Sequence, residues 1–115
     1  MSQPAQVRVA FIALAFIAFF TMFFRLADRP IENFDEGIHG DVVREMVQRE
    51  SWITPYYRNA TYFRKPPLHF WLRIPLYHYL GVSTFTLRFW SALAGVGTVL
   101  LVAVWVWQRR KRLDE

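Results

Sequence analysis

Two long apolar stretches, residues 7–27 and 89–107, constrain the fold of this chain more than any other feature. As α-helices they would be about 31 Å and about 28 Å long, close to the roughly 30 Å hydrocarbon core of a bilayer. Arg8 and Arg25 lie near the ends of the first stretch, where long basic side chains can reach the headgroups. The pattern predicts an all-α integral membrane protein with two transmembrane helices.

A cleaved signal peptide is the alternative for the first stretch. The sequence FRLAD at 24–28 has no A-x-A-like cleavage site, and the run is long for a signal peptide, so we expect an uncleaved anchor. In the second stretch, Ser91 with Gly95 and Ala94 with Thr98 are pairs of small residues that allow another helix to approach closely.

The placement of charge predicts the orientation. The net charge is +5, and four of the fourteen basic residues, at 109–112, directly follow the second stretch. A cluster there suits an anionic lipid surface better than nucleic acid and marks residues 108–115 as a cytoplasmic tail. Both termini would then be cytoplasmic, residues 28–88 would form an extracytoplasmic loop, and a bacterial-type inner membrane is expected. The absence of cysteine excludes a thiol nucleophile and disulfides.

Within the loop, residues 35–50 have the spacing of an amphipathic helix. Its apolar face consists of Ile38, Val42, Val43, Met46 and Val47. Asn33 and Glu36 have the spacing of a capping box at its start. Beside a membrane, an amphipathic helix of this size is expected to lie in the interface.

The second half of the loop is aromatic and then proline-rich. Residues 51–65 are expected to be irregular, with turns at Thr54-Pro55 and Arg58-Asn59 and rings suited to the headgroup level. Pro66 and Pro67 force extended backbone before them and allow a helix after them. That second juxtamembrane helix is predicted over 68–80, too short and polar to span, with Gly81 ending it.

Two groups of loop residues could carry chemistry. Asp35 and Glu36 are four and three residues before His39, so on a helix they could act as acid–base groups or hold a cation. The alternative is that both carboxylates complement the helix N-terminus and His39 pairs with them on the surface. A second group, Arg58, Arg64 and Lys65, could bind a lipid phosphate or could supply only general headgroup attraction. We interpret His69 and His78 as interfacial histidines.

Several pieces in one order and spacing then suggest a family. They are Asp35-Glu36, Arg44-Glu45-Met46, Trp52-Ile53-Thr54-Pro55, Tyr62-Phe63, Lys65-Pro66-Pro67-Leu68, Trp71, Gly81 and Leu87-Arg88. Together they resemble the start of polytopic GT-C glycosyltransferases, the group that includes protein O-mannosyltransferases and lipid A aminoarabinose transferases. The resemblance implies a first outward loop, with two juxtamembrane helices, that holds the catalytic carboxylate and part of the donor-phosphate site. The reaction would be transfer of a sugar from a polyprenyl-phosphate carrier to an acceptor hydroxyl or phosphate.

The resemblance also implies roles for individual residues. Asp35 would act as general base on the acceptor or would position it for attack at the anomeric carbon, and Glu36 would be secondary to it. Lys65 would stabilise the departing lipid phosphate. A divalent metal near His39 is compatible with the group but is not indicated by the sequence. Arg64 stands where the group often has an acidic residue, which favours phosphate binding over metal binding at that position.

The resemblance covers only the first two spans of such an enzyme and the loop between them. Expected partners are therefore the lipid-linked sugar donor, a lipid or protein acceptor, membrane lipids and the remaining helices on another chain, with no nucleic acid. The isolated chain is not expected to turn over. The alternatives are a non-catalytic two-span membrane protein that binds lipid phosphate, or one that binds a protein partner through its aromatic loop.

Overall fold

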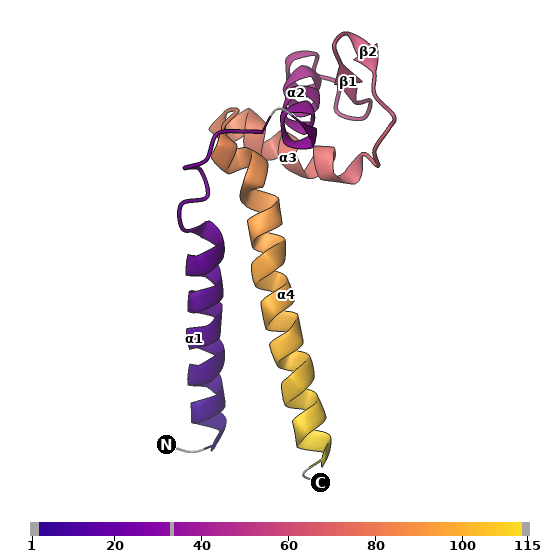
Figure 1. The fold of residues 1–115 in the computed structure, drawn as a ribbon. Coiled ribbons are helices and arrows are strands. Elements are labelled where there is room, and N and C mark those ends of the chain that lie inside the picture. The colour runs from indigo at the N-terminus through magenta and orange to yellow at the C-terminus, as the bar shows by residue number, and fades with distance from the viewer. Residues whose placement is uncertain (1–2, 33, 114–115) are drawn as a thin grey trace. The chain divides into compact units, whose positions relative to one another are not determined.

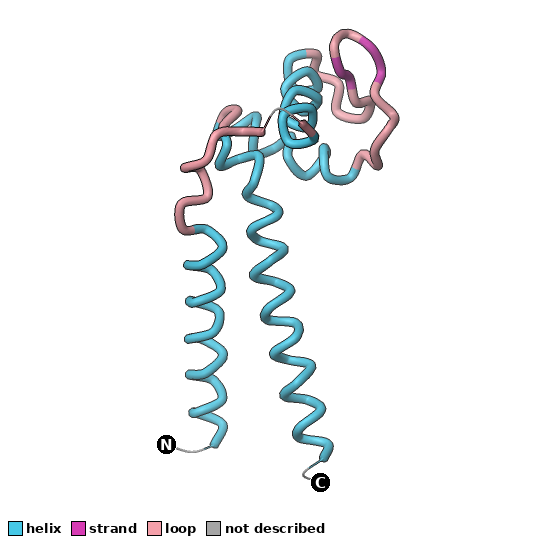
Figure 2. Tube along the Cα trace, in the orientation of Figure 1, coloured by secondary structure: helices cyan, strands magenta, loops and turns pink. Residues whose placement is uncertain are grey.

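The computed structural model describes residues 3–32 and 34–113, and it is mostly helical (Figures 1 and 2). The elements in chain order are α1 (Gln3–Phe23), α2 (Asp35–Gln48), β1 (Tyr56–Tyr57), β2 (Ala60–Thr61), α3 (Leu68–Leu80) and α4 (Thr84–Leu113). The chain divides into two compact units. The terminal unit comprises α1 and the residues of α4 from Ser91 onward, and the central unit comprises Arg25–Trp90.

In the terminal unit, α1 and α4 are long and apolar enough to cross a membrane, over Pro4–Phe23 and Thr84–Leu113. They run antiparallel, with Phe11 edge-on to Trp107 at a ring distance of 6.0 Å. At Gly95 a Cβ atom would lie 3.0 Å from Met22 Sδ, so the glycine allows the close approach expected of a small residue. Only 6% of the apolar window of α1 and 11% of that of α4 are buried, so their apolar surface needs lipid or further helices to cover it.

Helix α1 lies earlier than predicted, at 3–23 rather than 7–27. Pro4 suits the first turn of a helix, because its missing N–H has no partner there in any case. At the other end Arg25 adopts a left-handed φ of 58° and forms an ion pair with Asp28. The mostly apolar residues 24–27 therefore follow the end of the helix at Phe23, and hydrophobicity alone does not mark where the helix ends.

Helix α4 is longer than the predicted 89–107 at both ends. Ser83 Oγ accepts the N–H of Thr86 at 3.2 Å, and Thr86 Oγ1 accepts the N–H of Ser83 at 3.0 Å. This reciprocal pair caps the helix at Thr84. At the other end the helix continues through the basic residues to Leu113, and basic side chains complement a helix C-terminus. Asp114 and Glu115 of the predicted tail lie outside the described residues.

The core of the central unit forms where α2 packs on α3 (Figure 1). The buried side chains are Val42, Val43 and Met46 of α2, Phe70, Ile74 and Tyr77 of α3, and Leu87. Ile38, Val47, Tyr57 and Tyr62 pack around them. The predicted apolar face of α2 is thus confirmed, and it is covered by protein. The position of this helix in the membrane interface stays a prediction.

The ends of α2 differ slightly from prediction. It stops at Gln48 rather than at 50, because Arg49 forms the C-cap and Glu50 adopts a left-handed φ of 53°. At its start Phe34 is the N-cap residue and has no side-chain capping bond. Asn33, the first half of the predicted capping box, lies outside the described residues, whereas Glu36 Oε2 accepts the N–H of Glu32 at 3.1 Å.

The segment predicted as irregular contains a small antiparallel hairpin, in which Tyr56 pairs with Thr61 and Tyr57 with Ala60. Its turn residues, Arg58 and Asn59, have φ values of 50° and 64°, as a two-residue hairpin turn requires. The carboxylate of Glu45 on α2 accepts both of their N–H groups, at 2.6 and 3.2 Å. A turn without glycine is therefore held by a side chain from another element.

Helix α3 has the predicted bounds, Leu68–Leu80. Pro67 already has helical backbone angles, and its carbonyl accepts the N–H groups of Phe70 and Trp71 at 3.0 Å each. Gly81 ends the helix with a φ of +79°, a conformation that favours glycine. The proline pair and this glycine therefore fix both ends of the element.

Truncation of Phe70 should destabilise the central unit most clearly. Phe70 is fully buried between the two helices, so Phe70→Ala is expected to lower the free energy of unfolding by about 3–5 kcal/mol. Chemical unfolding in detergent micelles, followed by near-ultraviolet circular dichroism, measures this. Phe63→Ala is the matched control, because that ring is 74% exposed. Equal losses in the two variants would contradict the assigned core.

Candidate functional site

The structure brings together Asp35 and Lys65, which lie in different parts of the central unit. Asp35 is the first residue of α2, and Lys65 precedes the two prolines that lead into α3. Lys65 Nζ lies 3.5 Å from Asp35 Oδ2, with 41% and 74% of the two side chains exposed. Because an exposed ion pair is worth only about 0–1 kcal/mol, either side chain can exchange its partner for a ligand at low cost.

Glu36 has a different environment. Arg88 donates to both of its carboxylate oxygens, from Nε at 2.6 Å and from Nη2 at 2.9 Å. The same guanidinium donates to the carbonyls of Leu26, Arg29 and Pro30 at 3.0–3.1 Å. The hydrogen bonds from Arg88 lower the pKa of Glu36. The Glu36–Arg88 clamp therefore ties the connector, the first turn of α2 and the start of α4 together.

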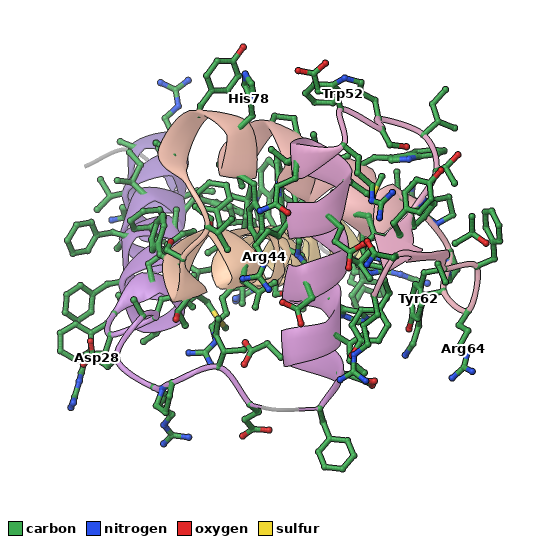
Figure 3. The ribbon with its side chains drawn as sticks, turned by 90° about the horizontal axis from the view of Figure 1, so that it is seen from above. Asp28, Arg44, Trp52, Tyr62, Arg64 and His78 are labelled. Carbon is green, nitrogen blue, oxygen red and sulfur yellow. The ribbon has the colours of Figure 1, made fainter. Side chains whose placement is uncertain are left out.

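The predicted basic cluster of Arg58, Arg64 and Lys65 is not assembled around one point. Arg58 sits in the hairpin turn, with its guanidinium 5.1 Å from the centre of the Tyr57 ring. Arg64 is exposed and points outward from the loop (Figure 3). Among the contacts of the described residues, neither arginine joins Asp35 or Lys65. Of the three basic residues, Lys65 is the one that the described contacts place beside the Asp35 carboxylate.

His39 lies against His69 of α3, with ring centres 4.7 Å apart, and edge-on to Phe70. His69 Nδ1 lies 2.9 Å from the carbonyl oxygen of Pro66 and must donate to it, which leaves Nε2 of a neutral ring as an acceptor. The Nε2 atoms of both rings are buried without a hydrogen-bond partner in the described part of the chain. Burial, and then nearby charges, lower the pKa of each imidazole.

Arg73 completes this group of polar side chains. Its Nε donates to the carbonyl of Leu87 at 3.1 Å, while its Nη1 is buried without a described partner. Arg73 and Lys65 line an open hollow of about 440 Å³ together with His39 and His69. A larger hollow of about 680 Å³ lies in the terminal unit, but it is lined by Arg8, Arg110 and Lys111 and contains none of the predicted site residues.

A metal centre is not favoured by this arrangement. Within residues 3–32 and 34–113, no three His, Asp or Glu side chains are grouped so that they could hold a metal ion. The two histidines come closest, but Lys65 and Arg73 line the same hollow, and their positive charges oppose a bound cation.

Sequence reasoning missed His69, Arg73 and Arg88 as members of the site. His69 and Arg73 are four residues apart on α3, a spacing that places them on one face and could have identified them. Arg88 was noted only as part of the family pattern. Its partner Glu36 is 52 residues away along the chain, and no local pattern reports such a contact.

With two candidate membrane-spanning helices and a polar site on the segment between them, the class defined by fold and site is a helical membrane protein. Comparison with known proteins gives the relatives. The chain is 33% identical over 100 residues to the undecaprenyl phosphate-α-4-amino-4-deoxy-L-arabinose arabinosyl transferase of Aeromonas salmonicida, and 32% identical over 99 residues to that of Aeromonas hydrophila. Each match covers 82% of this chain and 18% of the relative.

The enzyme of the same name from Pectobacterium carotovorum is 35% identical over 80 residues, which is 67% of this chain and 14% of that protein. No protein-family model matches the chain, and no solved structure matches it. The resemblance predicted from the motifs is confirmed: the chain belongs with the undecaprenyl-phosphate aminoarabinose transferase group. It spans about a fifth of the length of the relatives it matches.

The Glu36–Arg88 clamp generates a prediction about acid stability. Glu36→Gln should lower the free energy of unfolding at pH 7 by about 1–2 kcal/mol, because the guanidinium of Arg88 loses the negative charge of its partner. The folded pKa of Glu36 is below its ordinary value of 4.5. Its contribution is therefore complete above about pH 4.5 and is lost as the pH falls through the folded pKa.

Unfolding midpoints measured from pH 7 to pH 3 test this. The gap between wild type and Glu36→Gln should close on acidification, whereas the exposed Glu50→Gln control should stay close to wild type at pH 7. A gap that is unchanged down to pH 3 would show that the ionised form of Glu36 is not what stabilises the fold.

Proposed function

We propose that this chain is the part of a membrane glycosyltransferase that holds its general base, Asp35, and its donor-phosphate cation, Lys65. The enzyme transfers a sugar from a polyprenyl-phosphate donor to an acceptor at the outer face of the membrane. The observation that carries the proposal is the Asp35–Lys65 pair, at 3.5 Å, in a chain similar to arabinosyl transferases. By analogy with the names of these relatives, the donor is an undecaprenyl-phosphate-linked aminoarabinose.

The chemistry needs one base and one cation. Asp35 accepts the proton of the acceptor hydroxyl while that oxygen forms a bond to the anomeric carbon. The bond from the anomeric carbon to the phosphate oxygen breaks, and its electron pair stays with the departing lipid phosphate. The ammonium group of Lys65 stabilises the charge that grows on this phosphate.

The exposure of the pair suits this role. A substrate can enter only if the two side chains separate. Because their ion pair is exposed to solvent and screened, the separation costs little free energy. Glu36 serves as a positioning residue rather than as a second acid–base group, because both of its oxygens bind Arg88. Arg58 and Arg64 attract anionic headgroups, at about 1 kcal/mol each, without touching the reacting atoms.

Further helices complete the enzyme. The chain aligns with about 18% of the length of its relative from Aeromonas salmonicida. Within the chain, the apolar surfaces of α1 and α4 are largely uncovered. We infer that membrane lipids and additional helices, on a continuation or on another chain, cover these surfaces and enclose donor and acceptor. Residues 28–88 face outward in this proposal, and both termini are cytoplasmic.

Loss of the base should abolish transfer. In membranes that contain this chain with any continuation encoded beside it, Asp35→Asn should reduce sugar transfer by about 10²–10⁴-fold and Lys65→Gln by about 10²–10³-fold. Radiolabelled sugar transferred from a lipid-linked donor is the measurement. Asp41→Asn and Arg44→Gln are matched controls, because they form an exposed ion pair on the same helix. Undiminished transfer in Asp35→Asn would refute the assigned base.

The result in the absence of transfer is also informative. If no combination transfers sugar while the chain still binds polyprenyl phosphate, the enzymatic proposal fails and a lipid-phosphate-binding protein remains. If neither activity is found, the aromatic segment is left as a surface for a protein partner.

The orientation can be tested with single cysteines, because the natural sequence has none. Thr61→Cys, on the exposed strand β2, should react with a membrane-impermeant maleimide on intact cells. Leu113→Cys, which is 85% exposed at the end of α4, should react only after the cells are lysed. The opposite pattern of labelling would place the site on the cytoplasmic face.

A further inference from the structure

We propose that His39, His69 and Arg73 form a phosphate-binding site that takes up protons when the phosphate binds. The inference rests on the proposed function, in which the neighbouring Lys65 meets the phosphate of the lipid-linked donor. It adds two histidines and an arginine from α2 and α3, and it makes the affinity of the site depend on pH.

Three unpartnered nitrogen atoms carry the argument. The Nε2 atoms of His39 and His69 and the Nη1 atom of Arg73 are all buried without a hydrogen-bond partner in the described part of the chain. Leaving a buried polar atom unpaired is unfavourable, so a ligand that pairs all three recovers much of that cost. All three atoms belong to residues that line one hollow of about 440 Å³.

The chemistry of these atoms selects an oxyanion. The guanidinium of Arg73 can only donate. His69 has its Nδ1 committed to the Pro66 carbonyl, so its Nε2 is an acceptor when the ring is neutral and a donor when it is protonated. Donors from all three residues therefore require a protonated His69, whereas His39 can donate from Nε2 either as that neutral tautomer or when protonated. A phosphate supplies the group of acceptor oxygens.

The surrounding charges favour an anion as well. Lys65 and Arg73 act on both rings, and each lowers the pKa of His39 and of His69. On α2 the opposing charge is Asp35, which raises the pKa of His39, while Glu36 is occupied by Arg88. Tyr77 contributes a neutral phenol beside Arg73, because burial raises its pKa to about 12. An unliganded site therefore has an excess of positive charge without any proton on the imidazoles.

The direction of the proton linkage follows. Burial and the two cations hold the pKa of each imidazole below its ordinary value of 6.5 in the free site. A phosphate anion in contact favours the imidazolium form and raises both pKa values. If phosphate binding raises the pKa of one imidazole by one unit, binding is about tenfold stronger at a pH below the pKa of the free site. This gain is lost as the pH rises above the pKa of the bound state.

The remaining walls of the hollow suit a lipid. Pro66, Leu68 and Leu72 are the apolar residues that line it. The first isoprene units of a polyprenyl phosphate could rest on them while the phosphate contacts the polar atoms. Both rings line the hollow and are only partly buried. Side-chain adjustment on binding is common, so a small shift of the rings that keeps the bond from His69 Nδ1 to Pro66 can expose the covered Nε2 atoms to a ligand.

The histidine resonances of the chain provide a direct test. The chain has three histidines, so His→Gln variants can assign every imidazole signal in its NMR spectrum. The chain in detergent micelles is titrated from pH 8 to pH 5 alone and with farnesyl phosphate, inorganic phosphate or farnesol. A phosphate monoester itself titrates near pH 6, so the imidazole signals are followed rather than the affinity alone.

The expected result is an upward pKa shift of at least about one unit for His39 or His69 with farnesyl phosphate, which corresponds to a tenfold effect on binding. Farnesol should produce no shift. His78, which lies against Trp52 and Tyr79 away from the hollow, is the internal control and should not respond. An equal shift with inorganic phosphate would mean that the phosphate alone is recognised, and a larger shift with farnesyl phosphate would mean that the apolar wall contributes.

A variant series checks the same contacts. Arg73→Gln should weaken binding of farnesyl phosphate about tenfold or more, Arg73→Lys should restore part of it, and Arg44→Gln should leave it unchanged. If Arg73→Gln fails to fold, the wild-type titration still decides the question. Histidine pKa values that do not change with either phosphate, or that change equally with farnesol, overturn the proposal.

The outcome is separable from that of the proposed function, because the titration needs no turnover. Shifted histidines in a protein that never transfers sugar would support the phosphate site and count against the enzyme. Transfer that depends on Asp35, without any histidine shift, would support the enzyme and remove the proton-linked site.

Discussion

The burial of the apolar face of α2 against α3 is the interaction on which the rest of the central unit depends. Asp35 and His39 are placed by α2, while Lys65 and His69 are placed by the start of α3. The contact around Phe70 and Met46 therefore sets the distances between side chains that are far apart in sequence. Because these side chains are almost fully buried and closely packed, the apolar core determines the distances between the residues of the polar site.

Asp35 and Glu36 are adjacent in the sequence, but one carboxylate is free to move and the other is held in place. Glu36 is held by a guanidinium that also binds three backbone carbonyls, so moving it would leave several polar groups unpaired. Asp35 is exposed, and its ion pair with Lys65 is weak. A fixed carboxylate thus stands next to an adaptable one, which suits the proposal that Asp35, and not Glu36, meets the substrate.

The elements that could be predicted from the sequence were those with local causes. The bounds of α3 follow from Pro66, Pro67 and Gly81, and the buried face of α2 follows from the spacing of Val42, Val43 and Met46. The hairpin was missed because its turn, Arg58-Asn59, lacks glycine and is held by Glu45 from α2. The start of α4 was missed because charge, rather than the Ser83–Thr86 cap, was used to delimit the apolar stretch.

The sequence by itself determined two apolar helices, a polar segment with two shorter helices between them, and Asp35 and Lys65 as the principal polar candidates. Hydrophobic periodicity and proline and glycine positions encode such features within a few residues of the chain. Only the tertiary structure decided that Lys65 lies beside Asp35 while Arg58 and Arg64 do not, that Glu36 is bound by Arg88, and that His39 faces His69. These contacts join residues far apart in the sequence, and the packing of α2 against α3 and the start of α4 selects them, which no local pattern can specify.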